Sequence, residues 1–241
     1  MNIIDSHVHL TGEVSSGDGQ TRADPVDKLV GTMDSLDIAK VCLQGLQGGD
    51  NQLVLEAKRK HPSRIIPFIY MDPTADALDL KGLDAVQGIG EIYIRPGSSE
   101  IPTNHVAELM NVAKKHDWPI LFHTGEFSYT APMIFKEVIE SHPNLTFIFG
   151  HMGSLAFVQD AIHMAAKSRN LYLETSGMTS KDMLEKAVRK CGADKLLYGS
   201  DYPFWDPEPH IELIKSLDIT RGQREKIFGG NVKRIISEET N

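Results

Sequence analysis

The chain has 241 residues, of which 41% are hydrophobic and 24% charged, enough to bury a full core in one large domain or two small ones. Its net charge of −8 argues against a nucleic-acid partner or an anionic membrane surface, and no apolar run approaches the roughly twenty residues of a membrane-spanning helix. The chain has only two cysteines, Cys42 and Cys191, which argues against a disulfide framework, and no signal peptide opens the chain, so we expect a soluble cytoplasmic domain of the size of an enzyme.

Short apolar runs alternate with segments of helical periodicity along the whole chain. The apolar runs predict strands beginning at residue 3 and over residues 39–43, 65–70, 88–94, 119–122, 145–149, 171–173 and 195–198. The periodic segments predict helices over residues 25–36, 51–60, 74–83, 103–116, 131–141, 155–167, 181–190, 209–216 and 221–236. Asp24 before Pro25 is typical of a helix start, and Thr220 with Gln223 fits a capping box.

These elements form eight strand-then-helix units of about 30 residues each, close to the ~250 residues of a (β/α)8 TIM barrel. The strands show little alternation, as expected when helices cover a parallel sheet. No linker or change in composition divides the chain, so we predict a single α/β domain over residues 1–241. The alternative is an open doubly wound sheet, but no Gly-x-Gly-x-x-Gly opens the first helix.

Polar side chains able to bind a metal follow five of the predicted strands. The first strand carries His7 and His9, which share a face because side chains alternate along a strand. The later strand ends carry Glu91, His123, His151 and Asp201. Since active sites of (β/α)8 barrels lie at the carboxyl ends of the strands, we expect these side chains to meet at one rim. Imidazole and carboxylate groups are good zinc ligands.

The other six histidines lie on or near predicted helices, and we interpret them as structural. They are His61, His105, His116, His142, His163 and His210. Three of them, His61, His116 and His142, stand at helix C-termini, where a partly charged imidazole complements the helix dipole.

Five motifs run from the first strand to the last helix: residues 4–9 (IDSHVH), 121–123 (LFH), 149–153 (FGHMG), 198–203 (YGSDYP) and 227–231 (IFGGN). In this order they resemble the amidohydrolase superfamily. The nearest branch is amidohydrolase family 2, which also contains decarboxylases acting on aromatic and related acids. The resemblance implies a metal-dependent TIM-barrel enzyme in which His7, His9 and Asp201 bind a divalent metal. It also implies that His123 and His151 bind metal or contact substrate.

The fourth-strand run contains no lysine, and Glu91 in this run resembles the glutamate of TatD-like members. An unpaired carboxylate is costly to bury, so a cation beside it is expected. We predict that Glu91 is a ligand and that the site holds one or two divalent ions, with zinc as the expected metal. In the two-ion arrangement Glu91 lies between an ion on the first-strand histidines and Asp201 and an ion on the histidines of strands five and six. The alternative is that Glu91 pairs with Arg95 or with a metal-bound histidine.

The predicted chemistry is hydrolysis of an amide, lactone or ester-like bond in a small molecule. A zinc-type cation lowers the pKa of bound water toward ~7. Asp201 would accept the proton of the attacking water and pass it to the leaving group. His151 or His123, where not ligated, would hydrogen-bond the developing oxyanion.

Substrate contacts are predicted from residues that flank these ligands. Tyr93 and Arg95 share the face of Glu91 on the fourth strand, and Arg95 could anchor a carboxylate or phosphate group. A solvent-facing Arg95 is an equally good interpretation. Tyr202 follows Asp201 and could wall the pocket or pack on a helix. The glycine-rich residues 11–23 fit either a lid or a disordered loop.

Three further functions stay open at this point. The first is a lyase, a metal-dependent decarboxylase of a small carboxylic acid, which would release carbon dioxide without incorporating water. The second is a TatD-like nuclease, which the acidic composition disfavours. The third is a barrel that binds metal without turnover. The sequence also leaves open whether identical chains form a homo-oligomer.

Overall fold

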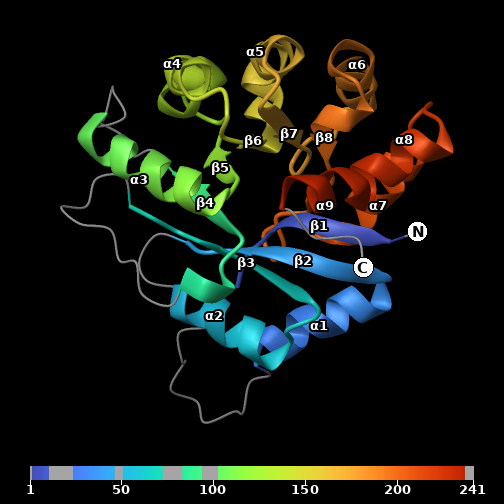
Figure 1. Cartoon of the computed structure of the whole chain (residues 1–241). Coiled ribbons are helices and arrows are strands. Elements are labelled where there is room, and N and C mark those ends of the chain that lie inside the picture. Colours follow the sequence, from blue (N-terminus) through green and yellow to red (C-terminus); the bar gives the residue numbers. More distant parts are fainter. Residues whose placement is uncertain (1, 11–23, 47–50, 73–82, 94–102, 237–241) are drawn as a thin grey trace.

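The computed structural model describes residues 2–10, 24–46, 51–72, 83–93 and 103–236. Eight parallel strands form one sheet in the order β1 to β8, so each strand lies beside its sequence neighbours (Figure 1). They are β1 (Ile3–Val8), β2 (Ile38–Gln44), β3 (Ile65–Ile69), β4 (Gly88–Ile92), β5 (Ile120–His123), β6 (Phe147–Gly150), β7 (Leu171–Glu174) and β8 (Leu196–Leu197). The predicted (β/α)8 barrel is confirmed.

The two edges of the sheet meet where β1 lies beside the segment around β8. The amide of Ser6 donates to the carbonyl of Tyr198 at 2.9 Å, and the amide of Asp201 donates to the carbonyl of His7 at 2.8 Å. These contacts nearly close the barrel. They also place Asp201 next to the histidines of β1, although almost the whole chain separates them in sequence.

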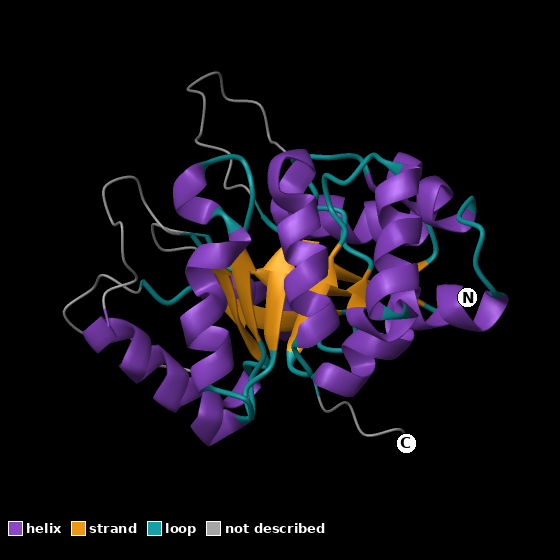
Figure 2. Cartoon of the chain, turned by 90° about the horizontal axis from the view of Figure 1, so that it is seen from above, coloured by secondary structure: helices purple, strands orange, loops and turns teal. Residues whose placement is uncertain are grey.

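The helices surround the strands (Figure 2). They are α1 (Pro25–Ser35), α2 (Asn51–Lys60), α3 (Thr103–His116), α4 (Lys136–Ser141), α5 (Ser154–Lys167), α6 (Lys181–Cys191), α7 (Pro207–Lys215), α8 (Arg221–Glu225) and α9 (Asn231–Ile235). The predicted starts are confirmed at Asp24, which accepts from the amide of Val26 at 2.8 Å, and at the Thr220 capping box. The helix predicted over residues 74–83 lies almost wholly outside the described residues.

Two predicted helices differ from the structure. Residues 131–141 begin with a 3-10 turn at Pro132–Phe135 before α4, and residues 221–236 are interrupted by a π-helical turn at Lys226–Gly230. The second interruption has a steric reason, because a Cβ at Gly229 would lie 2.5 Å from the carbonyl oxygen of Asn2. The glycine lets the chain pass close to the start of β1, and paired glycines weaken regular helix geometry.

The core has two parts. The larger cluster lies between the strands and the helices, and a smaller one takes side chains from β1, β2, β3, β5, β6, β8 and α9, including Ile4, Phe68 and Leu121. Such a cluster fills the interior of a (β/α)8 barrel. Apolar side chains therefore fill the interior of the barrel, except where polar side chains enter it. Cys42 and Cys191 do not form a disulfide with each other, and Cys42 belongs to the smaller cluster.

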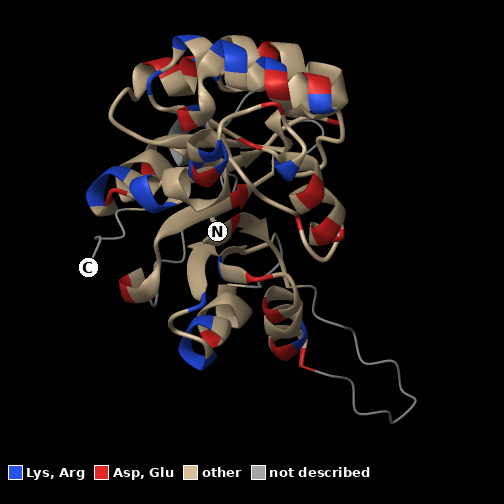
Figure 3. Cartoon of the chain, turned by 90° about the vertical axis from the view of Figure 1, so that its right-hand side faces the viewer, with Lys and Arg blue, Asp and Glu red and all other residues tan. Residues whose placement is uncertain are grey.

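The outer surface carries charges of both signs, and Lys, Arg, Asp and Glu are interleaved over the helices seen in Figure 3. Neither sign forms a separate face in that view. Among the helices of the described residues, none combines the length and apolar character needed to cross a membrane.

His210 on α7 contributes to the pH dependence of stability. Its Nε2 lies 3.0 Å from Oγ1 of Thr175, and its ring stacks on Tyr198 at 5.7 Å. Burial, only partly offset by the charge of Glu174, lowers the pKa of His210 from 6.5 to about 4. The unfolded chain therefore binds more protons than the folded chain between these values. Stability from this group is present above pH 6.5 and is lost as the pH falls toward 4, by about 2 kcal/mol at pH 5.

Urea denaturation of His210→Gln tests this expectation. Between pH 8 and pH 5 the wild-type protein should lose about 2 kcal/mol more unfolding free energy than the variant. His163→Gln, which removes an exposed imidazole on α5, is the matched control and should behave like the wild type. Equal losses in wild type and His210→Gln would contradict the assignment.

Candidate metal centre

Six buried polar side chains meet at the carboxyl ends of β1, β4, β5 and β6 and just after β8. They are His7, His9, Glu91, His123, His151 and Asp201, each at most 8% exposed. These are the six ligands predicted from the strand ends, and the structure brings all of them together. Charged and imidazole groups are rarely buried at this density unless they pair or bind a metal.

The first group lies on β1 and after β8. His7 Nε2 and His9 Nε2 are 3.0 Å apart, and Asp201 Oδ1 lies 3.8 Å from the former and 3.4 Å from the latter. Glu91 Oε2 lies 3.4 Å and 3.3 Å from the same two nitrogens. Candidate ligand atoms of His7, His9 and Asp201 all lie within 4.8 Å of one another, close enough for one cation to contact all three.

The second group lies on β5 and after β6. His123 Nδ1 is 2.8 Å and His151 Nε2 is 3.2 Å from Glu91 Oε1, and the two nitrogens are 3.1 Å apart. Ligand atoms of His7, Glu91 and His151 also lie within 4.8 Å of one another. The carboxylate of Glu91 thus turns one oxygen toward each pair of histidines.

The hydrogen-bond partners of the β1 histidines test whether a cation fits this site. His7 Nδ1 lies 2.8 Å from Glu174 Oε2, and His9 Nδ1 lies 3.3 Å from the carbonyl oxygen of Gln44. Both partners are acceptors, so each Nδ1 carries a proton, and each ring in the neutral form that binds a metal turns a bare Nε2 inward. Two nitrogen lone pairs 3.0 Å apart, beside two carboxylates, repel one another unless a cation lies between them.

His151 has the same arrangement through Ser176. The Ser176 hydroxyl donates to Glu174 Oε2 at 2.7 Å and lies 2.8 Å from His151 Nδ1. Its proton is used, so it accepts from Nδ1–H and leaves His151 Nε2 bare toward Glu91. The donor set of imidazole nitrogens and carboxylate oxygens therefore fits a divalent cation.

The pKa values reflect the same density of charge. Burial opposes ionisation throughout, but the carboxylates of Glu91 and Glu174 hold the pKa of His7 well above its ordinary value. The imidazoles of His7 and His123 outweigh burial at Glu91 and hold the pKa of its carboxyl well below the usual range. Asp201 differs, because burial raises the pKa of its carboxyl. Of the Glu91 and Asp201 carboxylates, that of Asp201 is therefore the better proton acceptor.

Backbone conformation sets two of these side chains apart. His151 and Asp201 have φ angles of 59° and 61°, in the left-handed region that residues other than glycine rarely adopt. Such conformations persist where the surroundings fix them, and here the Asp201 amide is held by the His7 carbonyl. The strain is consistent with a functional role for both residues.

Glu174 is the main site residue that the sequence analysis missed. It ends β7, is fully buried, and accepts from His7, the amide of His151 at 3.1 Å and Ser176. Burial would raise the pKa of its carboxyl, but the charge of His7 and these hydrogen bonds lower it to about 2. A Cβ at Gly199 would collide with this carboxylate, so the glycine of the YGSDYP motif makes room for it. Glu174 could have been predicted from its position at the carboxyl end of the seventh strand, by the same reasoning that predicted the six ligands.

We expect Glu174→Gln to lower metal affinity about 10–100-fold, the usual effect of removing a carboxylate that orients a ligating histidine. The amide that replaces one carboxylate oxygen is a donor, and every partner of Glu174 is also a donor. Competition with a chelator measures the affinity. Glu212→Gln on the exposed face of α7 is the control, and an unchanged affinity in folded Glu174→Gln would rule out the positioning role.

The predicted substrate contacts fall in different places. The Tyr93 ring packs at a tilt against that of His123, with ring centroids 4.6 Å apart, so it borders the centre. Tyr202 is half-buried and packs on the larger core cluster, and its contact with substrate stays a prediction. Arg95 and the loop over residues 11–23 lie outside the described residues. Phe204, with its ring 5.7 Å from that of His9, also borders the site.

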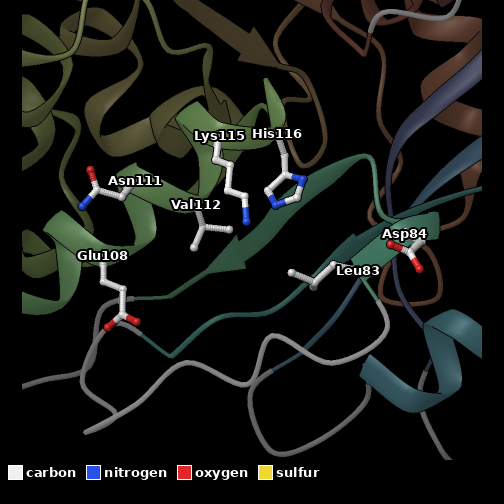
Figure 4. Close-up of a pocket in the computed structure, with 7 residues that line it drawn as sticks. All are labelled: Leu83, Asp84, Glu108, Asn111, Val112, Lys115 and His116. Atoms are coloured by element: carbon white, nitrogen blue, oxygen red, sulfur yellow. The ribbon is translucent and has the colours of Figure 1, made fainter.

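A separate hollow of about 440 Å³ lies between α3 and the 3-10 turn Leu83–Ala85 (η1). Figure 4 shows Val112, Lys115 and His116 of α3 on one side of it and Leu83 and Asp84 on the other. These residues precede β5 and β4, at the opposite end of the strands from the six ligand candidates. The hollow is therefore not part of the metal centre.

Fold and site together define a metal-dependent (β/α)8-barrel enzyme. The family model Amidohydro_2, described as amidohydrolase, matches residues 4–236, so the chain belongs to this amidohydrolase family. Among curated relatives, the gamma-resorcylate decarboxylase of Rhizobium radiobacter is 25% identical over 158 residues, which cover 56% of this chain and 48% of that protein. The chain spans 36–48% of the length of the first curated relatives that it matches.

Two solved structures share the fold. An uncharacterised TIM-barrel protein from Bordetella bronchiseptica has a TM-score of 0.79 and 20% identity, covering 98% of this chain and 99% of its own. The 5-carboxyvanillate decarboxylase of Sphingomonas paucimobilis has a TM-score of 0.72 and 15% identity, with the same coverage. At these identities the likeness supports the barrel and not a particular reaction.

Proposed function

We propose that this chain is a metal-dependent hydrolase that cleaves an amide, lactone or ester-like bond of a small molecule, with two divalent ions held side by side. The observation that carries the proposal is the Glu91 carboxylate, whose Oε2 faces the β1 histidines while its Oε1 faces His123 and His151. A carboxylate in this position can bridge two ions at the ~3.5–4 Å separation typical of two-metal hydrolytic sites. Zinc is the metal we favour.

Ions bound here would supply an acidified water and would polarise the carbonyl oxygen of the substrate. Asp201 accepts the proton of the attacking water, for which its raised pKa suits it. As the water oxygen bonds to the carbonyl carbon, the bond to the leaving nitrogen or oxygen breaks, and Asp201 returns the proton to that atom. His151 binds an ion or, in its protonated form, hydrogen-bonds the developing oxyanion. Tyr93 and Arg95 would contact the rest of the substrate.

A second candidate is non-oxidative decarboxylation of a small carboxylic acid, which the curated decarboxylase relatives favour. In that reaction a carbon–carbon bond breaks, carbon dioxide leaves, and the remaining carbon takes a proton. One ion is enough to hold the substrate oxygens, and no water is consumed. The number of ions and the fate of water therefore separate the two reactions.

The deciding experiment uses zinc-loaded protein in ¹⁸O-labelled water, screened with lactones, amides, esters and small carboxylic acids. Hydrolysis puts one labelled oxygen into the product and releases no carbon dioxide. Release of carbon dioxide with no label in the other product would overturn the proposal in favour of the lyase.

The two-ion arrangement predicts the metal stoichiometry of Glu91→Gln. Elemental analysis of zinc-saturated wild-type protein should give about two ions per chain, and the variant should hold about one, because an amide is a poor bridge between cations. Glu140→Gln, which changes an exposed side chain on α4, is the control. A single ion in the wild type, with Glu91 outside its coordination, would refute the bridge and strengthen the decarboxylase alternative.

A further inference from the structure

A second hollow of about 390 Å³ adjoins the metal centre beside α7. We call it the α7 pocket, and its lining includes Gly177, Ser200, Trp205, Pro209, His210 and Leu213. Its volume falls within the ~300–1,000 Å³ of small-molecule sites. It is formed by the segments that follow β7 and β8 and by α7, so it opens at the same end of the barrel as the six ligand candidates.

The wall of the α7 pocket is continuous with the catalytic candidates. A Cβ at Gly177 would lie 3.8 Å from His151 Nδ1, so the backbone there runs close to that imidazole. Ser200 directly precedes Asp201, and the amide of Trp205 donates to the Asp201 carbonyl at 3.3 Å. The α7 pocket therefore borders the Nδ1 side of His151 and the backbone of Asp201, and an arm that extends past His151 from the metal centre would enter it.

Carbon dominates the inner surface of the α7 pocket, through Trp205, Pro209 and Leu213. Trp205 is 54% exposed while its amide is hydrogen-bonded to Asp201, and an exposed indole at the edge of a pocket is a typical anchor for an apolar group. The polar groups are already engaged. His210 is bound to Thr175 and, with a pKa near 4, is neutral at pH 7, while Asp206 Oδ1 accepts the amide of Glu208 at 3.0 Å.

We propose that the α7 pocket receives an apolar arm of the substrate, aromatic or aliphatic, while the bond to be broken lies at the metal centre. This inference rests on the proposed function for the position of the reacting bond, and it narrows the substrate to small carbonyl compounds that carry such an arm. Trp205 is a specificity-determining residue, which packs on the arm and takes no part in the chemistry.

Binding of hydroxamates tests the inference without turnover, because the hydroxamate group chelates zinc whichever reaction the enzyme performs. Zinc-loaded protein is titrated calorimetrically with acetohydroxamate, benzohydroxamate and 3-phenylpropanohydroxamate. At least one phenyl compound should bind ten times more tightly than acetohydroxamate or better, which corresponds to burial of on the order of 50 Å² of apolar surface. Trp205→Ala should reduce that preference at least threefold and leave acetohydroxamate binding unchanged.

Leu155→Ala is the matched control, since Leu155 is a 64% exposed apolar residue on α5 outside the α7 pocket, and it should keep the full preference. Equal binding of all three hydroxamates, or a preference that Trp205→Ala does not change, would overturn the α7 pocket as a subsite while leaving the metal centre intact. Failure of every hydroxamate to bind would instead overturn the metal centre, and with it both proposals.

Discussion

Asp201→Asn is expected to lower kcat about 10²–10⁴-fold, the usual contribution of a general base. The substitution keeps the size of the side chain and an oxygen able to bind metal, but the amide cannot take up a proton. Burial raises the pKa of Asp201, and its Oδ1 lies 3.4 Å from His9 Nε2, so its position beside the predicted ion is well defined. The rate is measured on the best substrate from the screen, with metal content determined on the same sample.

Metal content separates two causes of a lost rate. If Asp201→Asn keeps its metal and loses rate, Asp201 acts as the base; if metal is also lost, the drop should be larger. Asp182→Asn, on the exposed first turn of α6, controls for the loss of a carboxylate and should leave the rate unchanged. A rate within tenfold of wild type in metal-replete Asp201→Asn would exclude this residue as the base.

Much of the barrel follows from the sequence because its elements are locally encoded. Short apolar runs and helical periodicity located all eight strands, and Asp24 and Thr220 located helix starts through local hydrogen bonds. Strand β8, predicted over residues 195–198, is observed only as Leu196–Leu197. Tyr198 leaves the ladder because its amide donates to the carbonyl of Ile227 and its carbonyl accepts from Ser6. Partners that distant in sequence leave no local pattern.

The candidate site shows the same division between local and distant information. The six ligand candidates are predicted by one rule, that the carboxyl ends of the strands meet at one rim. This rule does not require knowing which distant residues contact each other. The residues that orient the ligands can be predicted only when their distant contacts are known, since the contact of Glu174 with His7 joins positions 167 residues apart. Asp5 is a second case: its Oδ1 accepts from the amides of His7 and Ser200, which ties the first motif to the YGSDYP motif. Neither contact can be read from spacing alone.

Replacing both His7 and His9 by Ala is expected to have the largest effect, with loss of at least one ion per chain and of all measurable activity. Their Nε2 atoms are the nearest nitrogen pair in the site, 3.0 Å apart, and without them the first group keeps only carboxylate oxygens. Zinc should then no longer raise the melting temperature, as we expect it to do for the wild type, because a ligand that binds only the folded state stabilises it. Elemental analysis and thermal scans with and without zinc measure both effects.

The matched control for this double variant replaces His142 and His163, which removes two imidazoles from outside the site. His142 Nδ1 donates to the carbonyl of Val138 at the end of α4, and His163 lies exposed on α5. That control should keep its metal and its zinc-dependent rise in melting temperature. Because both β1 histidines are buried, folding of the site variant is checked by circular dichroism before metal is measured. A folded His7→Ala/His9→Ala protein with full metal occupancy would show that the ions bind elsewhere.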